Sequence, residues 1–178
     1  MSDHWTGAGS DPAPVQVRTA RLADPDDASL VSRLLADYLV ATEREKGSRL
    51  SGASALPERY QREVLMPREE LARCHVLLGL VQGRPAGIVV LTPALQGRCE
   101  LKRLWTIPES RGVGVADALL TTALDLARDR HDHEVRLSVW RWREGAIRLY
   151  ERRGFREVPT WESRPELVCM SLALSPLA

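Results

Sequence analysis

The chain has 178 residues, a length that suits one domain with its own hydrophobic core. Its 25 Lys and Arg residues against 24 Asp and Glu residues leave a net charge of +1, which argues against nucleic acid as a partner. No apolar run approaches the ~20 residues that cross a bilayer, so no membrane partner is expected. Residues 1–14 lack the basic and apolar segments of a secretory signal. We therefore expect a flexible tail at 1–14, a single domain at 15–178 and a cytoplasmic protein.

The first half of the chain predicts a strand followed by two helices. Residues 15–22 (VQVRTARL) have the composition and alternation of a strand. Asp24 is placed to cap a helix whose first residue is Pro25 and whose end is marked by Gly47. After a loop of small residues, a second helix is expected at 58–71, interrupted near its proline.

The second half predicts a hairpin and then strands that alternate with helices. Residues 74–82 and 86–92 form the hairpin around a Gly-Arg-Pro turn. A hairpin followed by a helical crossover predicts an α/β fold, with a mixed, mostly antiparallel central sheet flanked by helices on both faces. The later elements are expected as strand 99–107, a helix from 115, strand 134–142, helix 143–153 and strand 166–174.

The cysteines and histidines do not indicate a metal site, and no metal is expected. Cys74, Cys99 and Cys169 are odd in number, widely spaced and set in apolar runs, which is typical of buried reduced thiols. His131 and His133 fall in a polar connection between a helix and a strand. Solvated side chains are expected there rather than a pair of metal ligands.

The most informative segment is a glycine loop that opens into a helix. Pro108 ends the preceding strand, Gly112 and Gly114 follow, and apolar residues then recur at the spacing of a helix with one buried face. Glycines let a ligand approach the backbone closely. A helix start offers about four unpaired N–H groups and a partial positive charge. The segment therefore predicts a site for phosphate oxygens.

Two common phosphate loops do not fit this segment. A P-loop needs Lys and then Ser or Thr after its last glycine, where this chain has Val115, Ala116 and Asp117. A dinucleotide fingerprint needs a third glycine or alanine where Asp117 stands. The pattern that does fit is R/Q-x-x-G-x-G/A, which Arg111, Gly114 and Ala116 match.

This third pattern resembles the acetyl-CoA loop of the GNAT superfamily of N-acetyltransferases. The resemblance covers residues 15–174 and is most specific between Glu100 and Phe155. There, ELKRLWTIPESRGVG is similar to the family's fourth strand and turn, and VRLSVWRWREGAIRLYERRGF to its fifth strand and fourth helix. The second segment ends in the Y-E-x-x-G-F signature, at Tyr150, Glu151, Gly154 and Phe155.

The resemblance implies acetyl-CoA as the cosubstrate. The family's fourth and fifth strands splay apart, which leaves main-chain groups along Leu104, Trp105 and Thr106 for the pantetheine arm. Trp105 also fits plain core packing, and Arg111 fits a solvated loop charge. Relatives commonly have Asn where this chain has Arg143, whose guanidinium cannot accept hydrogen bonds but can meet a phosphate. The backbone amides implied for the diphosphate belong to Arg111, Gly112, Val113, Gly114, Val115 and Ala116.

Two residues are candidates for proton transfer. Glu100 occupies the strand position where several family members have a glutamate that deprotonates the amine. Strand alternation predicts that it shares a face with Lys102, opposite Arg103. Tyr150 is the general acid that the resemblance implies for the departing thiolate. Each has a structural alternative: Glu100 as an exposed strand charge, and Tyr150 as a core tyrosine.

The resemblance predicts direct transfer of an acetyl group from acetyl-CoA to a primary amine of a small-molecule or peptide acceptor. The alternative is a non-catalytic acyl-CoA-binding module, serving as a sensor or a structural unit. Another donor, such as succinyl-CoA, stays open, and so does the acceptor, because the Leu50–Pro57 loop carries no signature. Trp140 and Trp142 either line an acceptor pocket or cover the sheet. A homodimer is an expectation at the level of the family.

Overall fold

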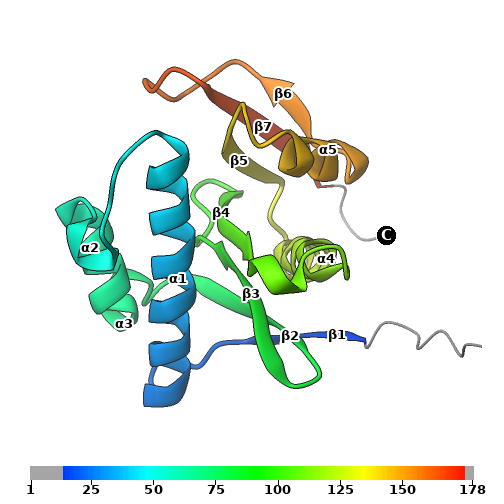
Figure 1. Ribbon diagram of the computed structural model, residues 1–178. Coiled ribbons are helices and arrows are strands. Elements are labelled where there is room, and N and C mark those ends of the chain that lie inside the picture. Colours follow the sequence, from blue (N-terminus) through cyan, green and yellow to red (C-terminus); the bar gives the residue numbers. More distant parts are fainter. Residues whose placement is uncertain (1–13, 175–178) are drawn as a thin grey trace, which may run out of the picture.

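A computed structural model describes residues 14–174, and the expected tail at 1–14 lies outside this range except for Pro14. Seven strands form one sheet in the order β1-β2-β3-β4-β5-β7-β6 (Figure 1). Neighbouring strands pair antiparallel except β4 and β5, which are parallel. The predicted mixed, mostly antiparallel sheet is confirmed. The strands are Val15–Thr19 (β1), His75–Val81 (β2), Arg84–Leu91 (β3), Arg98–Thr106 (β4), Glu134–Trp140 (β5), Arg156–Val158 (β6) and Leu167–Ala173 (β7).

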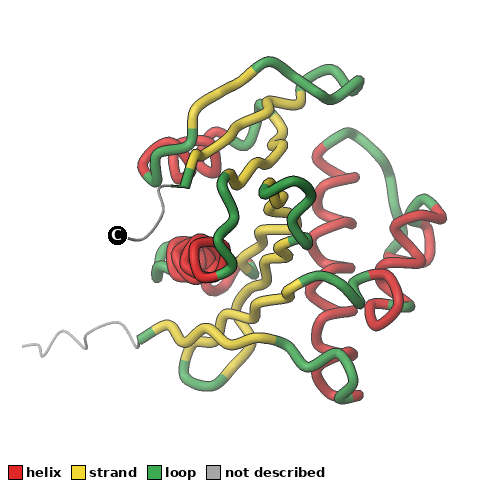
Figure 2. Tube along the Cα trace, turned by 180° about the vertical axis from the view of Figure 1, so that it is seen from behind, coloured by secondary structure: helices red, strands yellow, loops and turns green. Residues whose placement is uncertain are grey.

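Helices cover both faces of the sheet, as the sequence predicts. One face carries α1, α2 and α3, and the other carries α4 and α5 (Figure 1, Figure 2). Leu34 of α1 and Ile88 of β3 belong to the core on the first face, and Leu119 of α4 and Val89 of β3 to the core on the second. The helices are Pro25–Glu45 (α1), Glu58–Leu65 (α2), Pro67–Glu70 (α3), Val115–Asp129 (α4) and Glu144–Arg152 (α5), with short 3₁₀ turns at Ala53–Ala55 and Pro108–Ser110.

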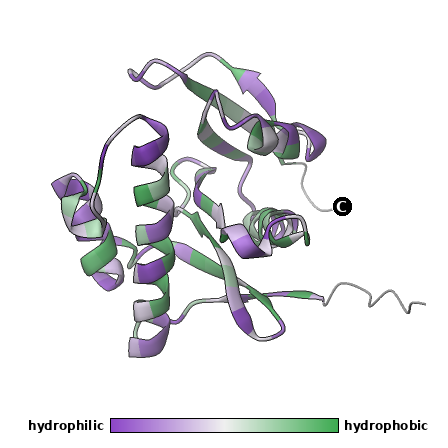
Figure 3. Ribbon diagram, in the orientation of Figure 1, coloured by the Kyte–Doolittle hydropathy of each residue, from purple (hydrophilic) through white to green (hydrophobic). Residues whose placement is uncertain are grey.

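The longest helix, α1, begins and ends where the sequence predicts. The Asp24 side chain accepts a hydrogen bond from the backbone N–H of Asp26 at 2.9 Å, and Pro25 opens the first turn. Gly47, with φ +90°, follows the last turn. Hydrophobic and hydrophilic residues alternate along α1 (Figure 3), so that one stripe packs on the sheet. Within residues 14–174, no helix is both long and apolar enough to cross a membrane.

Some element boundaries differ from the prediction. The expected second helix is divided in two, because Pro67 has no N–H to continue α2 and instead opens α3. The strand expected to reach Trp142 ends at Trp140, and α5 is one residue shorter at each end than expected. β6 has no counterpart in the prediction, because three residues are too few to show alternation. It pairs with β7 at the sheet edge, so that β7 lies between β5 and β6.

Two glycines bring the start of α4 close to the centre of the sheet. Gly79 on β2 and Gly87 on β3 are cross-strand neighbours. A Cβ added at Gly87 would lie 2.5 Å from the Trp105 carbonyl oxygen and 2.8 Å from Val115 Cγ1. Because no side chain fits between these atoms, glycine at this point seats the first turn of α4 directly beside the end of β4.

The sheet opens between β4 and β5. The two strands share only three residue pairs, from Arg98 with Glu134 to Glu100 with Arg136. β4 nevertheless continues to Thr106, and β5 to Trp140. Beyond Glu100 the strands diverge, as the family resemblance implies. The main-chain groups that face the opening are therefore left without a strand partner.

A β-bulge at Arg103 corrects the predicted alternation of β4. Between Val90 and Ile88 the strand β3 advances two residues, while β4 advances three, from Lys102 to Trp105. Arg103 supplies the extra residue and has a left-handed φ of +57°. The bulge turns Arg103 toward α2, on the same face as Lys102. The prediction that it lies on the opposite face is wrong.

Candidate functional site

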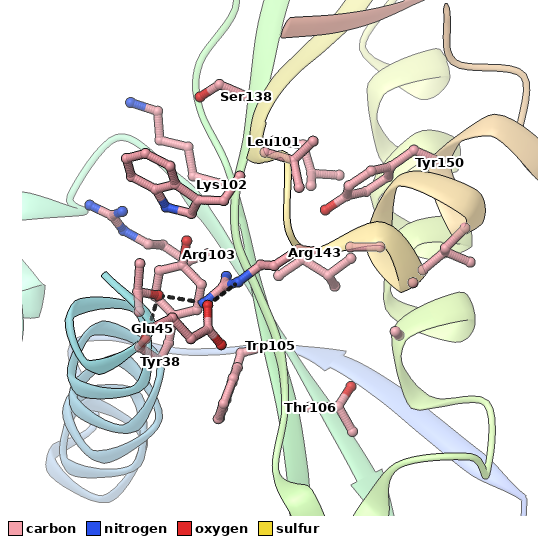
Figure 4. Close-up of a pocket in the computed structure, with 18 of the residues that line it drawn as sticks. Tyr38, Glu45, Leu101, Lys102, Arg103, Trp105, Thr106, Ser138, Arg143 and Tyr150 are labelled. Atoms are coloured by element: carbon pink, nitrogen blue, oxygen red, sulfur yellow. Dashed lines mark hydrogen bonds and ion pairs between the residues drawn. The ribbon is translucent and has the colours of Figure 1, made fainter. Parts of the chain in front are cut away.

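A cleft of about 1240 Å³ runs through the opening between β4 and β5 (Figure 4). On one side its walls come from α1, α2 and the end of β5, which we call the α1 side. On the other side they come from the glycine loop, α4 and α5, which we call the α4 side. Because the cleft passes between the strands, two molecules that enter from opposite faces can meet beside β4.

The glycine loop leaves the first turn of α4 without a side-chain cap. Gly112 and Gly114 have φ values of +81° and +89°, and the space where a Cβ would stand is open at both. Gly114 is the N-cap residue of α4, so the first N–H groups of the helix have no side-chain acceptor. These groups and the helix dipole are the features that bind anions at helix starts. Of the predicted loop residues, Arg111, Gly112, Gly114, Val115 and Ala116 line the cleft, whereas Val113 does not and is 39% exposed.

The charges around this loop favour an anion. Arg111 lies over the Trp105 ring, with its guanidinium carbon 5.1 Å from the ring centroid. Asp117 in the first turn of α4 would repel an anion, but Arg153 binds its carboxylate through Nε at 2.9 Å and through Nη2. Arg152 on α5 also lines the cleft. The loop is therefore a site of net positive charge.

The residues predicted for the pantetheine arm lie along the cleft at the end of β4. Leu104, Trp105 and Thr106 all line it. Trp105 Nε1 and Thr106 Oγ1 are buried, yet neither has a hydrogen-bond partner within the described residues. Buried polar atoms rarely stay unpaired, so both lack a partner that the described residues do not supply. The Trp105 ring also packs in the core, 6.1 Å from the ring of Tyr38 on α1.

Tyr150 is buried in the wall of the cleft. Its ring reaches from α5 toward the opening (Figure 4) and packs 5.7 Å from the Phe155 ring. Only 5% of the residue is exposed. Burial raises the pKa of Tyr150, the nearby Tyr38 adds to the rise, and the charge of Arg143 opposes it. Tyr150 is therefore a neutral hydrogen-bond donor at physiological pH.

Glu100 stands where the pairing between β4 and β5 ends. Its backbone N–H donates to Thr92 Oγ1 at 2.9 Å. Its carboxylate lies 3.3 Å from Lys102 Nζ, and its side chain is 21% exposed and lines the cleft. A carboxylate at this point can accept a proton from a ligand beside β4.

Arg143 is held by α1. Its Nε donates to Glu45 Oε2 at 2.8 Å, its Nη2 donates to Thr42 Oγ1 at 2.7 Å, and its guanidinium lies over the Tyr38 ring (Figure 4). Trp142 Nε1 donates to the same Glu45 oxygen at 3.1 Å. We call Thr42, Glu45, Trp142 and Arg143 the clasp, because they join α1 to the β5–α5 turn. The Arg143 guanidinium, which the sequence suggests for a phosphate contact, thus already binds Glu45 and Thr42. A contact between Arg143 and a cofactor stays a prediction.

Several side chains on the α1 side of the cleft have no sequence signature. Tyr38 and Tyr60 come from α1 and α2, and Arg103 lies between their rings, 5.6 and 5.4 Å from the centroids. Arg103 also donates to both carboxylate oxygens of Glu63, at 2.8 and 2.6 Å. No local motif marks these residues, because they meet only when the helices pack on the sheet. Trp140 and Trp142, which the sequence does single out, stack at 4.8 Å and both line the cleft.

The cysteines and histidines stand apart from this chemistry. Cys99 and Cys169 are buried, Cys74 is half-buried, and all three are free. Burial raises the pKa of the Cys99 thiol to about 12. Across residues 14–174, no three His, Cys, Asp or Glu side chains come together as metal ligands would.

The fold and the cleft together agree with one family of enzymes. Residues 36–155 match the acetyltransferase (GNAT) family, and the chain belongs to this family. The predicted family is therefore confirmed.

The chain is similar to two N-acetyltransferases by sequence. The Mus musculus protein named Probable N-acetyltransferase family 8 member 5 is 37% identical over 78 residues, which are 43% of this chain and 34% of that protein. The Escherichia coli K12 protein named Uncharacterized N-acetyltransferase YjgM is 33% identical over 72 residues, which are 40% of this chain and 43% of that protein. The match thus spans less than half the length of each relative.

Solved structures share the fold. PaiA N-acetyltransferase from Thermoplasma acidophilum, in complex with coenzyme A, aligns with a TM-score of 0.70 at 20% identity. The alignment covers 90% of this chain and 99% of that chain. At this level of identity the likeness concerns the fold, and it supports the predicted fold class.

Proposed function

We propose that the protein catalyses direct transfer of an acetyl group from acetyl-CoA to a primary amine. The observation that carries this proposal is the cleft between β4 and β5. It joins an uncapped helix start on the α4 side to a carboxylate and a buried phenol beside the opening. Membership of the acetyltransferase family gives independent support. Direct transfer fits because donor and acceptor can enter from opposite faces of the sheet.

The residues on the α4 side fit acetyl-CoA. The first N–H groups of α4 and the charge of Arg111 suit the diphosphate. Thr106 Oγ1 and the unpaired main chain of β4 suit the amide groups of the pantetheine arm. The open space at Gly112 leaves room for the ligand beside the loop. When bound, acetyl-CoA supplies an activated acetyl group, and the protein supplies position and protons.

In the proposed reaction the acceptor nitrogen loses two protons, one to Glu100 and one to Tyr150. The amine enters as an ammonium ion, and Glu100 accepts one of its protons and passes it to solvent. The neutral nitrogen forms a C–N bond to the acetyl carbonyl carbon while the C–S bond breaks. Tyr150 donates its proton to the leaving sulfur and regains one from the nitrogen as that becomes an amide. The net products are the N-acetyl amine, the CoA thiol and one proton.

Proton transfer from the Tyr150 phenol to the leaving thiolate is unfavourable in free energy. The ordinary pKa values of a phenol and a thiol differ by about 1.5 units, or about 2 kcal/mol, and the burial of Tyr150 widens that gap. A hydrogen bond from a neutral phenol still stabilises the negative charge that develops on the sulfur. We therefore assign Tyr150 mainly to this hydrogen bond, with proton transfer following as the C–S bond breaks.

Binding and turnover measurements test the proposal together. Calorimetric titration with CoA should show one site, and a thiol-release assay with acetyl-CoA and a panel of primary amines should show turnover. Gly112→Asp should weaken CoA binding by about thirtyfold or more, because it puts a negative charge and a side chain where the diphosphate would lie. Gly83→Asp is the matched control. Gly83 also has a positive φ (+73°) and open space, but it lies in the β2–β3 turn and does not line the cleft.

Each of the other outcomes has a definite meaning. If Gly112→Asp and Gly83→Asp lose CoA affinity equally, the cause is backbone strain, and the glycine loop is not part of the CoA site. Tight binding of acetyl-CoA without turnover of any amine would indicate a non-catalytic acyl-CoA-binding module instead. Faster turnover with succinyl-CoA than with acetyl-CoA would mean that the acyl donor is not acetyl-CoA.

A further inference from the structure

We propose that the acceptor is a primary amine that also carries a carboxylate, as an amino acid does, and that Arg59 binds this carboxylate. The inference rests on the proposed acetyl transfer and names the acceptor class for that reaction. It follows from the charged side chains that line the cleft and from which of them already have partners.

Every carboxylate that lines the cleft within residues 14–174 is paired with a cation. Glu100 is proposed to receive the reacting amine, and its partner Lys102 is 44% exposed. A second ammonium group on the acceptor, as in a polyamine, would find the other four carboxylates already paired. Displacing one of the resident cations would leave it without its counter-ion in a partly buried cleft. The pairs are Glu45 with Arg143 (2.8 Å), Glu100 with Lys102 (3.3 Å), Asp117 with Arg153, Glu144 with Arg148 (3.2 Å) and Glu162 with Arg164 (2.6 Å).

The cations of the cleft, by contrast, are not all neutralised. Arg59, Arg111 and Arg152 line it without a carboxylate partner in the described part of the chain. Arg152 is on the α4 side, where acetyl-CoA would bring its phosphates, and Arg111, whose guanidinium lies over the Trp105 ring, belongs to the loop proposed for the diphosphate. Arg59 is on α2, on the α1 side, where the acceptor would enter. Arg59 is exposed, and its charge is therefore accessible to a carboxylate of the acceptor.

Tyr60 holds the Arg59 guanidinium in place. Arg59 Nη2 donates to Tyr60 Oη at 2.9 Å, and the guanidinium carbon lies 4.5 Å from the ring centroid. Tyr60 itself is buried, so it is a fixed support. A guanidinium has five N–H donors, and only one of them is used here. The remaining planar fork matches a carboxylate through two parallel hydrogen bonds.

The neighbouring arginine does not compete for the same ligand. Arg103 lies 5.4 Å from the centroid of the Tyr60 ring, but both its Nε and its Nη2 are bound to Glu63. Its charge is balanced by Glu63, and it has no such pair of donors left for the acceptor carboxylate. Arg59 and Glu100 line the same cleft, and the proposal puts the carboxylate of the acceptor at Arg59 and its amine toward Glu100, beside the strand opening.

Matched pairs of acceptors test this inference. The pairs are L-leucine with isopentylamine and L-phenylalanine with phenethylamine, each assayed at saturating acetyl-CoA by thiol release and by mass spectrometry of the product. We expect the amino acid of each pair to have a kcat/KM at least about tenfold higher than the amine. Arg59→Gln should raise the KM of the amino acids by about tenfold and change that of the amines by less than about threefold.

Arg62→Gln is the matched control. Arg62 lies on the same helix, is paired with Glu70 at 2.6 Å and does not line the cleft. Neutral amines that react as well as the amino acids would overturn the inference and leave acetyl transfer standing. Equal losses for both acceptor types in Arg59→Gln, or equal changes in the two arginine variants, would also overturn it. If no acceptor is acetylated although acetyl-CoA binds, the transferase proposal fails and this inference fails with it.

Discussion

Replacing Tyr150 with Phe distinguishes a catalytic tyrosine from a core tyrosine. The substitution removes one oxygen and keeps the ring that packs against Phe155. No hydrogen bond holds the hydroxyl within residues 14–174, so the change leaves no buried partner unpaired. The free energy of unfolding should therefore change by less than about 1 kcal/mol. A tyrosine that served only the core would show no larger effect in any assay.

The effect of Tyr150→Phe on turnover should be much larger. A positioned hydrogen bond to charge that develops in the transition state contributes about 10²–10³-fold to the rate, which is about 3–4 kcal/mol of barrier. We expect kcat to fall by at least about 100-fold, measured by thiol release at saturating acetyl-CoA. The Kd for CoA, measured by calorimetry, should change by less than about threefold, because the proposed diphosphate site is the glycine loop before α4, whereas Tyr150 is on α5. An unchanged kcat would remove Tyr150 from the mechanism.

The pH dependence of stability gives a second check on the same residue. Burial raises the pKa of Tyr150 above its ordinary value of about 10, so the folded protein keeps this proton where the unfolded chain loses it. The stability that this group contributes is fully present below about pH 10 and is lost as the pH rises further. The melting temperature of the wild type should thus fall more steeply above about pH 10 than that of Tyr150→Phe. Parallel curves would contradict the burial.

Three more substitutions test separate contacts. Gly87→Ala puts a Cβ 2.5 Å from the Trp105 carbonyl oxygen. It should lower the free energy of unfolding, measured with urea, by about 1–3 kcal/mol. An unchanged urea midpoint would mean that α4 packs less closely against the sheet than described. Arg18 donates to both Asp27 oxygens, at 2.8 and 2.6 Å, and holds the Asp27 pKa down to about 2. Asp27→Asn should lower the free energy of unfolding by about 2 kcal/mol at pH 7, and this difference from the wild type should shrink as the pH falls from about 4 to about 2. A difference that does not depend on pH would rule out the ion pair. Thr106→Val removes a buried, unpaired hydroxyl. It should leave stability equal or higher and weaken CoA binding by about two- to tenfold, whereas unchanged binding would remove Thr106 from the CoA site.

The parts of the site that depend on neighbouring residues can be predicted from the sequence. Gly112 and Gly114 adopt left-handed φ values that favour glycine, and the helix that follows shows its buried face by spacing. Tyr150 belongs to a short signature whose Gly154 ends the helix at φ +92°. These residues could be located before the fold was known, because both the pattern and its structural consequence are local.

The parts that depend on distant pairing could not be predicted. The face of Arg103 is set by a bulge that arises from the register with β3, which no periodicity within β4 displays. Arg143 meets Glu45, which lies 98 residues earlier in the chain. Arg59 looks like any solvent-exposed residue of a short amphipathic helix. A helical pattern shows which side of α2 is apolar, but not which of its polar residues borders a cleft.

The clasp ties the width of the cleft on its α1 side to one carboxylate. Glu45 alone accepts hydrogen bonds from both Trp142 and Arg143, so a single carboxylate fastens the end of a long helix to a turn on the far half of the sheet. These are side-chain contacts at the ends of elements, and the strand ladder does not depend on them. Shortening the side chain at Glu45 would release both contacts at once and widen the cleft on the α1 side, where the acceptor is proposed to enter.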